Sequence, residues 1–206
     1  MKLIDLSYSI ENGMPTHPYD NEPTLFQDRF LEKDEYNNYC FQTGTHTGTH
    51  VDSPMHLTKS TSYISEYDLE NFCGEACVLD VSEEEIIKYK DSYKEKLKNN
   101  SIVLLYTGHE KKYGQKEYYT THPVIDFSMA EFLVESNVKL IGMDTPSPDK
   151  HPFLIHKYLF SKKMCLLENL CNLGLLLNEN RIELFAFPLK IKADASLVRA
   201  VARIAY

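Results

Sequence analysis

Stretches in which apolar and polar residues alternate, or in which apolar residues run together, recur along the chain and predict β-strands. Residues 2–10 alternate in the way that is typical of a half-buried strand. Further β-rich segments are predicted at 38–45, 78–81, 102–106, 139–143, 164–167, 181–191 and 197–205. The segment 38–45 leads directly into a run of polar residues that is described below.

Three helices are predicted between these strands. Ser82-Glu83-Glu84-Glu85 has the pattern of a capping box and predicts a helix toward Lys98, ended by Asn99-Asn100. Ser128-Met129-Ala130-Glu131 is a second capping box, which predicts a helix to about Ser136, and 152–161 is the third helical segment. Because helices alternate with more numerous strands, we predict an α/β fold, with one domain over residues 1–206 and flanking helices on a mixed β-sheet core.

Composition and charge narrow the class of protein. A net charge of −8 over 206 residues, without a basic cluster, argues against nucleic acid as a partner. No stretch approaches the ~20 apolar residues of a membrane span, and no apolar segment follows Met1. The five cysteines are scattered and odd in number, which is typical of reduced thiols. We therefore expect a cytoplasmic protein with no membrane or nucleic-acid partner.

The densest group of chemically active residues lies between Thr45 and Leu57 and reads His46-Thr47-Gly48-Thr49-His50-Val51-Asp52-Ser53-Pro54-Met55-His56. Three imidazoles and a carboxylate are costly to bury unless something compensates them. All four side chains are ligands that divalent metals accept. The run therefore predicts a metal site. The alternative is an exposed polar loop, or histidines that are each satisfied in the core.

The spacing of this run predicts a tight turn. An extended strand would hold His46 and His50 about 13 Å apart, too far for one metal with bonds of about 2 Å. A helix would bring them to about 5–6 Å, but Gly48, the threonines and the proline disfavour a helix. We expect a strand to end before this point and a turn at Gly48 to fold His46 back toward His50. Asp52 would follow on the same side as His50.

The ligand set is that of a catalytic site. Two histidines and one aspartate would leave a coordination position open for water or substrate. The nearest cysteines, Cys40 and Cys73, form no CxxC pattern with the run, so a closed structural zinc site is disfavoured. Asp52 has two oxygens and could bridge a second metal. His56 would be either a further ligand or a general acid/base, because an imidazole titrates near neutrality.

The run is similar to the HxGTHxDxPxH signature of the cyclase family of metal-dependent hydrolases, which includes bacterial kynurenine formamidases and isatin hydrolases. All of the fixed positions match: His46, Gly48, Thr49, His50, Asp52, Pro54 and His56. The resemblance extends over essentially the whole chain, through Ile4-Asp5-Leu6-Ser7, Gly13-Met14-Pro15, Tyr106-Thr107-Gly108, Thr121-His122-Pro123 and Leu167-Glu168-Asn169-Leu170. It implies the cyclase-family fold, of the swivelling β/β/α type.

The resemblance also implies a site with two metals. The residues that the family pattern makes metal ligands are His46, His50, Asp52, His156 and Glu168. In that pattern Asp52 touches both metals, and His56 is the catalytic acid/base rather than a ligand. The implied cofactor is Zn²⁺, two per subunit, with Mn²⁺ as the alternative. The implied partners are a small-molecule substrate and further copies of the chain, in a dimer or a tetramer.

The implied reaction is hydrolysis of an amide-type carbon–nitrogen bond by metal-activated water, as in the arylformamidases of tryptophan catabolism. Opening of a cyclic amide or lactone is the alternative reaction, and a noncatalytic metal-binding protein is the alternative class. Kynurenine formamidases of the family tend to carry an aromatic contact residue, often tryptophan, in an N-terminal proline-rich loop. This chain has no tryptophan, and the stretch reads Met14-Pro15-Thr16-His17-Pro18-Tyr19. We expect His17 or Tyr19 to contact the substrate.

Overall fold

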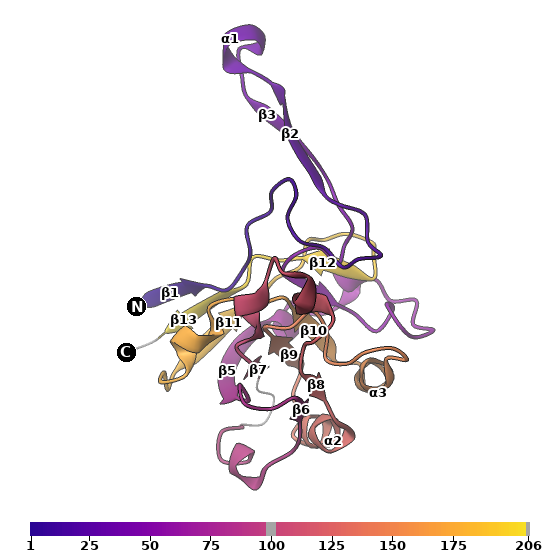
Figure 1. The fold of residues 1–206 in the computed structure, drawn as a ribbon, viewed down its shortest axis with the longest axis vertical. Coiled ribbons are helices and arrows are strands. Elements are labelled where there is room, and N and C mark those ends of the chain that lie inside the picture. The colour runs from indigo at the N-terminus through magenta and orange to yellow at the C-terminus, as the bar shows by residue number, and fades with distance from the viewer. Residues whose placement is uncertain (98–101, 205–206) are drawn as a thin grey trace.

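A mixed β-sheet forms the body of the molecule in the computed structural model, which describes residues 1–97 and 102–204 (Figure 1). Its strands are β1 (Lys2–Asp5), β4 (His50–Asp52), β5 (Cys73–Asp80), β7 (Ile102–Tyr106), β9 (Leu140–Met143), β10 (Cys165–Glu168), β11 (Ile182–Phe185), β12 (Ala195–Leu197) and β13 (Val201–Ile204). Their order across the sheet is β1-β13-β11-β5-β7-β9-β10-β4-β12. The central strands β5, β7, β9 and β10 are parallel, and the outer pairings are antiparallel. The prediction of an α/β fold with a mixed sheet is confirmed.

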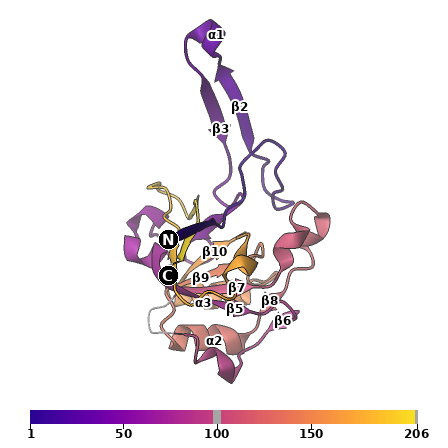
Figure 2. The ribbon, with the colours of Figure 1, turned by 90° about the vertical axis from the view of Figure 1, so that its left-hand side faces the viewer.

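Each face of the sheet carries its own hydrophobic core. Along β7, Val103 and Leu105 belong to one core, and Ile102 and Leu104 belong to the other. Helices α2 (Phe127–Glu135) and α3 (Leu154–Ser161) cover the first of these faces (Figure 2). A strand buried on both faces reads as a continuous apolar run, which is why 102–106 can be recognised from sequence.

The remaining elements are short. They are β2 (Thr24–Arg29), α1 (Leu31–Asp34), β3 (Asn38–Gln42), β6 (Ile86–Ile87), β8 (Val124–Ile125) and the 3₁₀ turns η1 (Ile64–Glu66), η2 (Leu69–Phe72), η3 (Asp91–Tyr93), η4 (His109–Lys112), η5 (Lys116–Tyr119) and η6 (Leu173–Leu176). Strands β2 and β3 pair with each other and, with α1 at the tip, project far from the body as an arm (Figures 1 and 2). Within the described ranges, every helix is too short or too polar to cross a bilayer.

The helix predicted from Ser82 toward Lys98 is wrong over its described part. Ser82 caps no helix there, since its hydroxyl donates to the Asp80 carboxylate and a turn follows. Ile86–Ile87 instead form β6 and pair in parallel with β8, and Ile87 is buried in the core beside α2. Burial of this strand pair overrides the helical pattern of charges, because tertiary contacts outweigh local propensity. Lys98 and the expected stop at Asn99-Asn100 lie outside the described residues.

Several element boundaries also differ from the predictions. The second helix begins at Phe127, and its N-cap is Asp126 rather than Ser128, with the Asp126 carboxylate accepting from the backbone N–H of Met129. The first strand ends at Asp5, and the strand before the metal run ends at Gln42. The final segment divides into β12 and β13, and Ala205 lies outside the described residues.

Candidate metal centre

The register of β4 against β10 builds the base of the site. The two strands are antiparallel, so the first residue of β4, His50, lies directly opposite the last residue of β10, Glu168. Residues opposite each other in an antiparallel pair share a face of the sheet, and so does Asp52, two residues along β4. After the turn at Gly48, His50 and Asp52 thus lie on a short strand.

A turn at Gly48 returns His46 to this cluster, as the spacing predicts. Gly48 has a φ of +60°, and a Cβ atom there would lie 2.9 Å from the Cε atom of Met14. Both the backbone conformation and the close approach require glycine. The ring centroids of His46 and His50 lie 5.2 Å apart, far closer than an extended chain would allow.

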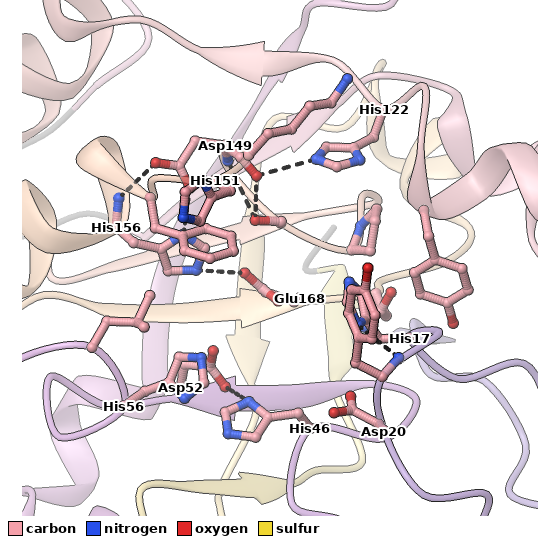
Figure 3. Close-up of a pocket in the computed structure, with 18 of the residues that line it drawn as sticks. His17, Asp20, His46, Asp52, His56, His122, Asp149, His151, His156 and Glu168 are labelled. Carbon is pink, nitrogen blue, oxygen red and sulfur yellow. Dashed lines mark hydrogen bonds and ion pairs between the residues drawn. The ribbon is translucent and has the colours of Figure 1, made fainter.

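The imidazoles and carboxylates alternate in a continuous chain of contacts (Figure 3). Asp52 Oδ1 lies 2.9 Å from His46 Nδ1 and 3.2 Å from His50 Nε2. Glu168 continues the chain, with Oε2 3.6 Å from His50 Nε2 and Oε1 3.3 Å from His156 Nε2. Helix α3 supplies His156, and every residue of this chain except His46 is buried.

Each imidazole in the chain has its other ring nitrogen held by a separate partner. His50 Nδ1 lies 2.8 Å from the carbonyl of Gly48, and His156 Nδ1 lies 2.6 Å from Asp149 Oδ1. His46 Nε2 lies 2.9 Å from Asp194 Oδ2. Metal-binding histidines are held in this way, because the hydrogen bond fixes the ring and leaves the second nitrogen as the ligand atom.

Three buried atoms of the cluster, His50 Nε2, Asp52 Oδ1 and Glu168 Oε1, contact the neighbouring imidazoles or carboxylates at 2.9–3.6 Å, but the geometry of these contacts is not that of a hydrogen bond. Orphaned buried polar atoms are costly, and nitrogen and carboxylate oxygen are ligands of divalent cations. Two groups of donors lie within 4.8 Å of one another, namely His46, Asp52 and His56, and His50, Asp52 and Glu168. The cluster therefore fits a bound metal, and Asp52 belongs to both groups.

Charge compensation within the cluster is strong. Burial disfavours a charged imidazole, but the neighbouring carboxylates outweigh it and raise the pKa of His46 to about 11 and that of His156 to about 9. Burial by itself would raise the pKa of Asp52, yet the rings of His46 and His50 hold it well below its usual range. The carboxylates thus keep protons on the imidazoles. A divalent cation would displace those protons, because a metal binds the neutral imidazole.

His56 lies beside the cluster in a more open position. Its ring centroid is 4.1 Å from that of His46, and its Nδ1 atom is 3.1 Å from Asp194 Oδ2. The side chain is 30% exposed, whereas that of His50 is 2% exposed. Its donor atom also falls within reach of His46 and Asp52. Both the ligand role and the acid/base role are thus geometrically open to it.

A cavity of about 650 Å³ opens above the cluster and contains the predicted contact residues His17 and Tyr19 in its lining. The ring centroids of His17 and Tyr19 lie 5.5 Å apart, and Tyr19 is 93% exposed. Other lining residues are Asp20, Leu57, Tyr119, His122, Lys150, His151 and Phe153. The cavity thus has a buried base of metal-type ligands and an exposed rim of aromatic and charged side chains.

Sequence reasoning missed Asp149 and Asp194, which hold His156 and His46 respectively. Neither belongs to the quoted motifs. Asp149 precedes His156 by seven residues without a recognisable pattern, and Asp194 is 148 residues from His46. His122 lies in the connecting segment between η5 and β8 and also belongs to the site. It is 6% exposed in the cavity wall, with Nε2 3.3 Å from the carbonyl of Asp149. Burial there lowers its pKa to about 4, so the ring is neutral.

Comparison with known proteins is consistent with this geometry. The family model described as "Putative cyclase" matches residues 4–150. A kynurenine formamidase from Bacillus anthracis is 32% identical over 210 residues, which covers 98% of this chain and 97% of the relative. Isatin hydrolase A from Labrenzia aggregata superposes with a TM-score of 0.88 at 22% identity, covering 100% of this chain and 94% of that structure. A potential metal-dependent hydrolase with cyclase activity superposes with a TM-score of 0.78 at 20% identity, covering 98% and 96%.

Proposed function

This chain belongs to the cyclase family, and we propose that it hydrolyses an amide-type carbon–nitrogen bond in a small molecule, with the specificity of a kynurenine formamidase. Similarity over almost the full length of relatives that carry that name supports the reaction. The substrate would then be N-formylkynurenine, an aryl formamide, and the products kynurenine and formate.

The observation that carries the proposal is the pairing of every imidazole in the cluster. His46, His50 and His156 each direct one nitrogen at a carboxylate of the cluster and have the other nitrogen held elsewhere. Buried histidines that only stabilise a fold need no such convergence on Asp52 and Glu168. We propose that these five residues hold two Zn²⁺ ions, because the nitrogen and oxygen donor set suits zinc. Mn²⁺ accepts the same donors and is the alternative.

The residues around the cluster would transfer a proton and contact the substrate. When bound, the metal supplies a Lewis acid that polarises the substrate carbonyl and lowers the pKa of water. His56 lies beside His46 with Nδ1 turned toward Asp194, which leaves its Nε2 atom to move a proton to the departing nitrogen. Tyr19 and His17 at the rim, with Phe153 deeper in the wall, present ring faces and edges to an aromatic substrate.

The direct test is an assay of zinc-loaded protein on N-formylkynurenine, isatin and simple aryl esters, with metal-depleted protein in parallel. We expect formate release from N-formylkynurenine, its loss on chelation and its recovery with zinc. Faster turnover of isatin would replace the formamidase assignment by opening of a cyclic amide. Tight zinc binding without turnover of any of these substrates would favour a noncatalytic metal-binding protein, and full activity without metal would contradict the metal mechanism.

The variant His56→Ala separates the two roles that the geometry leaves open. As an acid/base, His56 contributes to proton transfer, so we expect the variant to bind zinc as the wild type does and to lose about 100-fold or more in kcat. Metal analysis by mass spectrometry and steady-state kinetics measure the two quantities. A loss of one zinc per subunit would instead make His56 a ligand.

We propose further that the chain is a homo-oligomer held together through its arm. A two-stranded hairpin is marginally stable by itself, and β2 and β3 make no pairing with the main sheet among the described residues. Large side chains of the arm are exposed: Phe26, Phe30, Leu31, Tyr36, Tyr39 and Phe41. These side chains lie on both faces of the hairpin, since Phe26 is opposite Cys40 and Phe41 is opposite Leu25. Large apolar side chains exposed together on one projecting element mark a contact site, and a second copy is the commonest partner. Sedimentation of the wild type against Phe26→Ser/Phe41→Ser tests it, and a monomeric wild type would contradict it.

We place the reaction in tryptophan catabolism and in a reducing compartment, the cytoplasm. The five cysteines are free thiols. Burial raises the pKa of Cys77 to about 11 and that of Cys165 to about 12, so both stay protonated and unreactive. Such thiols are typical of proteins in a reducing environment.

A further inference from the structure

Asp194 occupies a position in the site that neither the motif nor the proposed ligand set includes. It lies in the segment between β11 and β12, and its side chain reaches two imidazoles at once. One oxygen, Oδ2, lies 2.9 Å from His46 Nε2 and 3.1 Å from His56 Nδ1. The same carboxylate thus faces a proposed metal ligand and the proposed acid/base.

The backbone around Asp194 is anchored without its carboxylate. Ser53 donates to the Asp194 carbonyl through both its N–H and its hydroxyl, at 2.9 and 2.7 Å, and the N–H of Ile64 donates to the carbonyl of Ala193 at 2.8 Å. The carboxylate accepts a long hydrogen bond of 3.3 Å from the Thr45 hydroxyl at Oδ1, and its closer contacts among the described residues are those to the two histidines. The side chain is thus available for a role other than holding the loop.

A shared carboxylate has separate consequences for the two rings. Held at Nε2, His46 keeps its Nδ1 atom directed at Asp52, which is the arrangement that orients a metal ligand. Held at Nδ1, His56 carries its proton on that nitrogen and presents the lone pair of Nε2. This tautomer is the one that lets an imidazole act as a general base, as in hydrolases where an aspartate orients the catalytic histidine.

We propose that Asp194 is a positioning residue that fixes the tautomer of His56 and the ring orientation of His46 through one carboxylate oxygen. The part that concerns His56 rests on the proposed hydrolytic function. The part that concerns His46 depends only on metal binding. Asp194 thereby couples metal affinity to proton transfer.

The kinetic test uses zinc-loaded protein with Asp194→Ala and Asp194→Asn, the second of which keeps the shape and one acceptor oxygen. For the alanine variant we expect zinc affinity to fall by about 10–100-fold and kcat at saturating zinc to fall by about 100-fold. For the asparagine variant we expect a smaller loss in both, as a partial rescue. Ser53→Ala is the matched control: it removes an anchor of the same loop, so it should lower the melting temperature while zinc affinity and kcat are kept.

A double variant decides whether Asp194 acts through His56. If it does, His56→Ala/Asp194→Ala has the same kcat at saturating zinc as His56→Ala alone, because residues that act as a unit are not additive. If Asp194→Ala lowers kcat by the same factor with and without His56, the positioning role is overturned. Wild-type kcat and zinc affinity in Asp194→Ala would overturn it as well.

The imidazole tautomers give a measurement that needs no turnover. In ¹⁵N spectra of the zinc-loaded wild type we expect His56 to carry its proton on Nδ1, and in Asp194→Ala we expect a mixture of tautomers. An unchanged His56 signal in Asp194→Ala overturns the proposal even if the protein is an active formamidase. If no substrate is turned over, the proposed function fails, and these spectra with the zinc affinities still decide the role of Asp194.

Discussion

The base of the cavity and its rim differ in burial and in the type of segment that carries their side chains. The base consists of His50, Asp52, His156 and Glu168, whose side chains are 2–5% exposed and lie on β4, β10 and α3. The rim consists of His17, Tyr19, Lys150 and His151, which are exposed residues of connecting segments. Strands and a helix hold the side chains of the base, whereas those of the rim lie on connecting segments, where His17 and His151 make ring contacts with Tyr119 and Phe153.

The side chains around the base are held by more hydrogen bonds than those of the rim. In the base, Asp149 receives the ring of His156 on one oxygen and the backbone N–H groups of Ile155 and His156 on the other. At the rim, the backbone N–H of Tyr19 donates to His17 Nδ1 at 3.4 Å and that of Asp20 donates to the His17 carbonyl at 2.9 Å, so both hydrogen bonds stay within one short segment. Catalytic groups have to be held rigidly in position. Loosely held side chains on loops can instead adopt different conformations for different substrates. We therefore expect the base to carry out the reaction and the rim to select the substrate.

The largest effect is expected from removing a ligand at the base. In His50→Ala a buried nitrogen ligand is lost, and Asp52 and Glu168 face each other without it. We expect loss of bound zinc and a fall in kcat/KM of about 1,000-fold or more. His17→Ala, which removes an imidazole from the rim, is the control and should keep its zinc. Elemental analysis and kinetics measure both, and a His50→Ala variant with full zinc content would break the distinction between base and rim.

A smaller effect is expected from changing Asp149, which holds the proposed ligand His156 by a hydrogen bond. Asp149→Asn replaces the carboxylate that holds His156, so we expect zinc affinity to fall by about 10–100-fold. Asp126→Asn is the matched control, because the Asp126 carboxylate also accepts a backbone N–H at the start of a helix, but its described partners are Ser128 and Met129 rather than a histidine. Titration calorimetry with zinc on both variants is the measurement. Equal affinities in the two variants would show that Asp149 serves only the helix.

A pH effect of moderate size is expected from the cavity wall, which resembles the base in its burial. His122 titrates near 6.5 in the unfolded chain and has its pKa lowered to about 4 by burial in the folded chain. The unfolded state therefore binds more protons between these values, so stability falls as the pH falls from 6.5 to 4. The contribution is on the order of 3 kcal/mol.

Denaturant unfolding of metal-depleted protein across that pH range measures this effect. His122→Gln should lose less stability than the wild type on acidification. His151→Gln, which removes an exposed histidine of the rim, controls for the loss of one imidazole. If the wild type and His122→Gln lose the same stability on acidification, protonation of His122 is not disfavoured by burial in the cavity wall.

The smallest effect is expected at the rim. Tyr19 is 93% exposed, so Tyr19→Ala removes a stacking surface worth about 1 kcal/mol and leaves the fold intact. We expect KM to rise by less than about 10-fold, with kcat and zinc content unchanged. Phe127→Ala, an exposed aromatic at the start of α2, should leave KM as it is. A 100-fold fall in kcat for Tyr19→Ala would show that Tyr19 takes part in the reaction, and would contradict the distinction between base and rim.

The secondary-structure prediction from sequence was more accurate for a strand buried on both faces than for an exposed, charged segment. The run at 102–106 is buried on both faces and its bounds were predicted to the residue. The helix expected from Ser82 rests on exposed Glu and Lys residues, and a two-residue strand stands there instead. Surface charge patterns are compatible with several conformations, whereas a continuous apolar run has to be covered on both sides. Local patterns therefore predicted the centre of the sheet better than its periphery.

The sequence by itself determined the local half of the candidate site. His46, His50, Asp52 and His56 lie within one short segment, and a turn at Gly48 suffices to bring His46 back to His50. Resemblance to a family was needed to add His156 and Glu168. Only the tertiary structure decided the rest: Asp149 folds back onto the start of α3 to hold His156, and loop packing brings Asp194 to His46. No spacing along the chain encodes which carboxylate will reach an imidazole more than a hundred residues away.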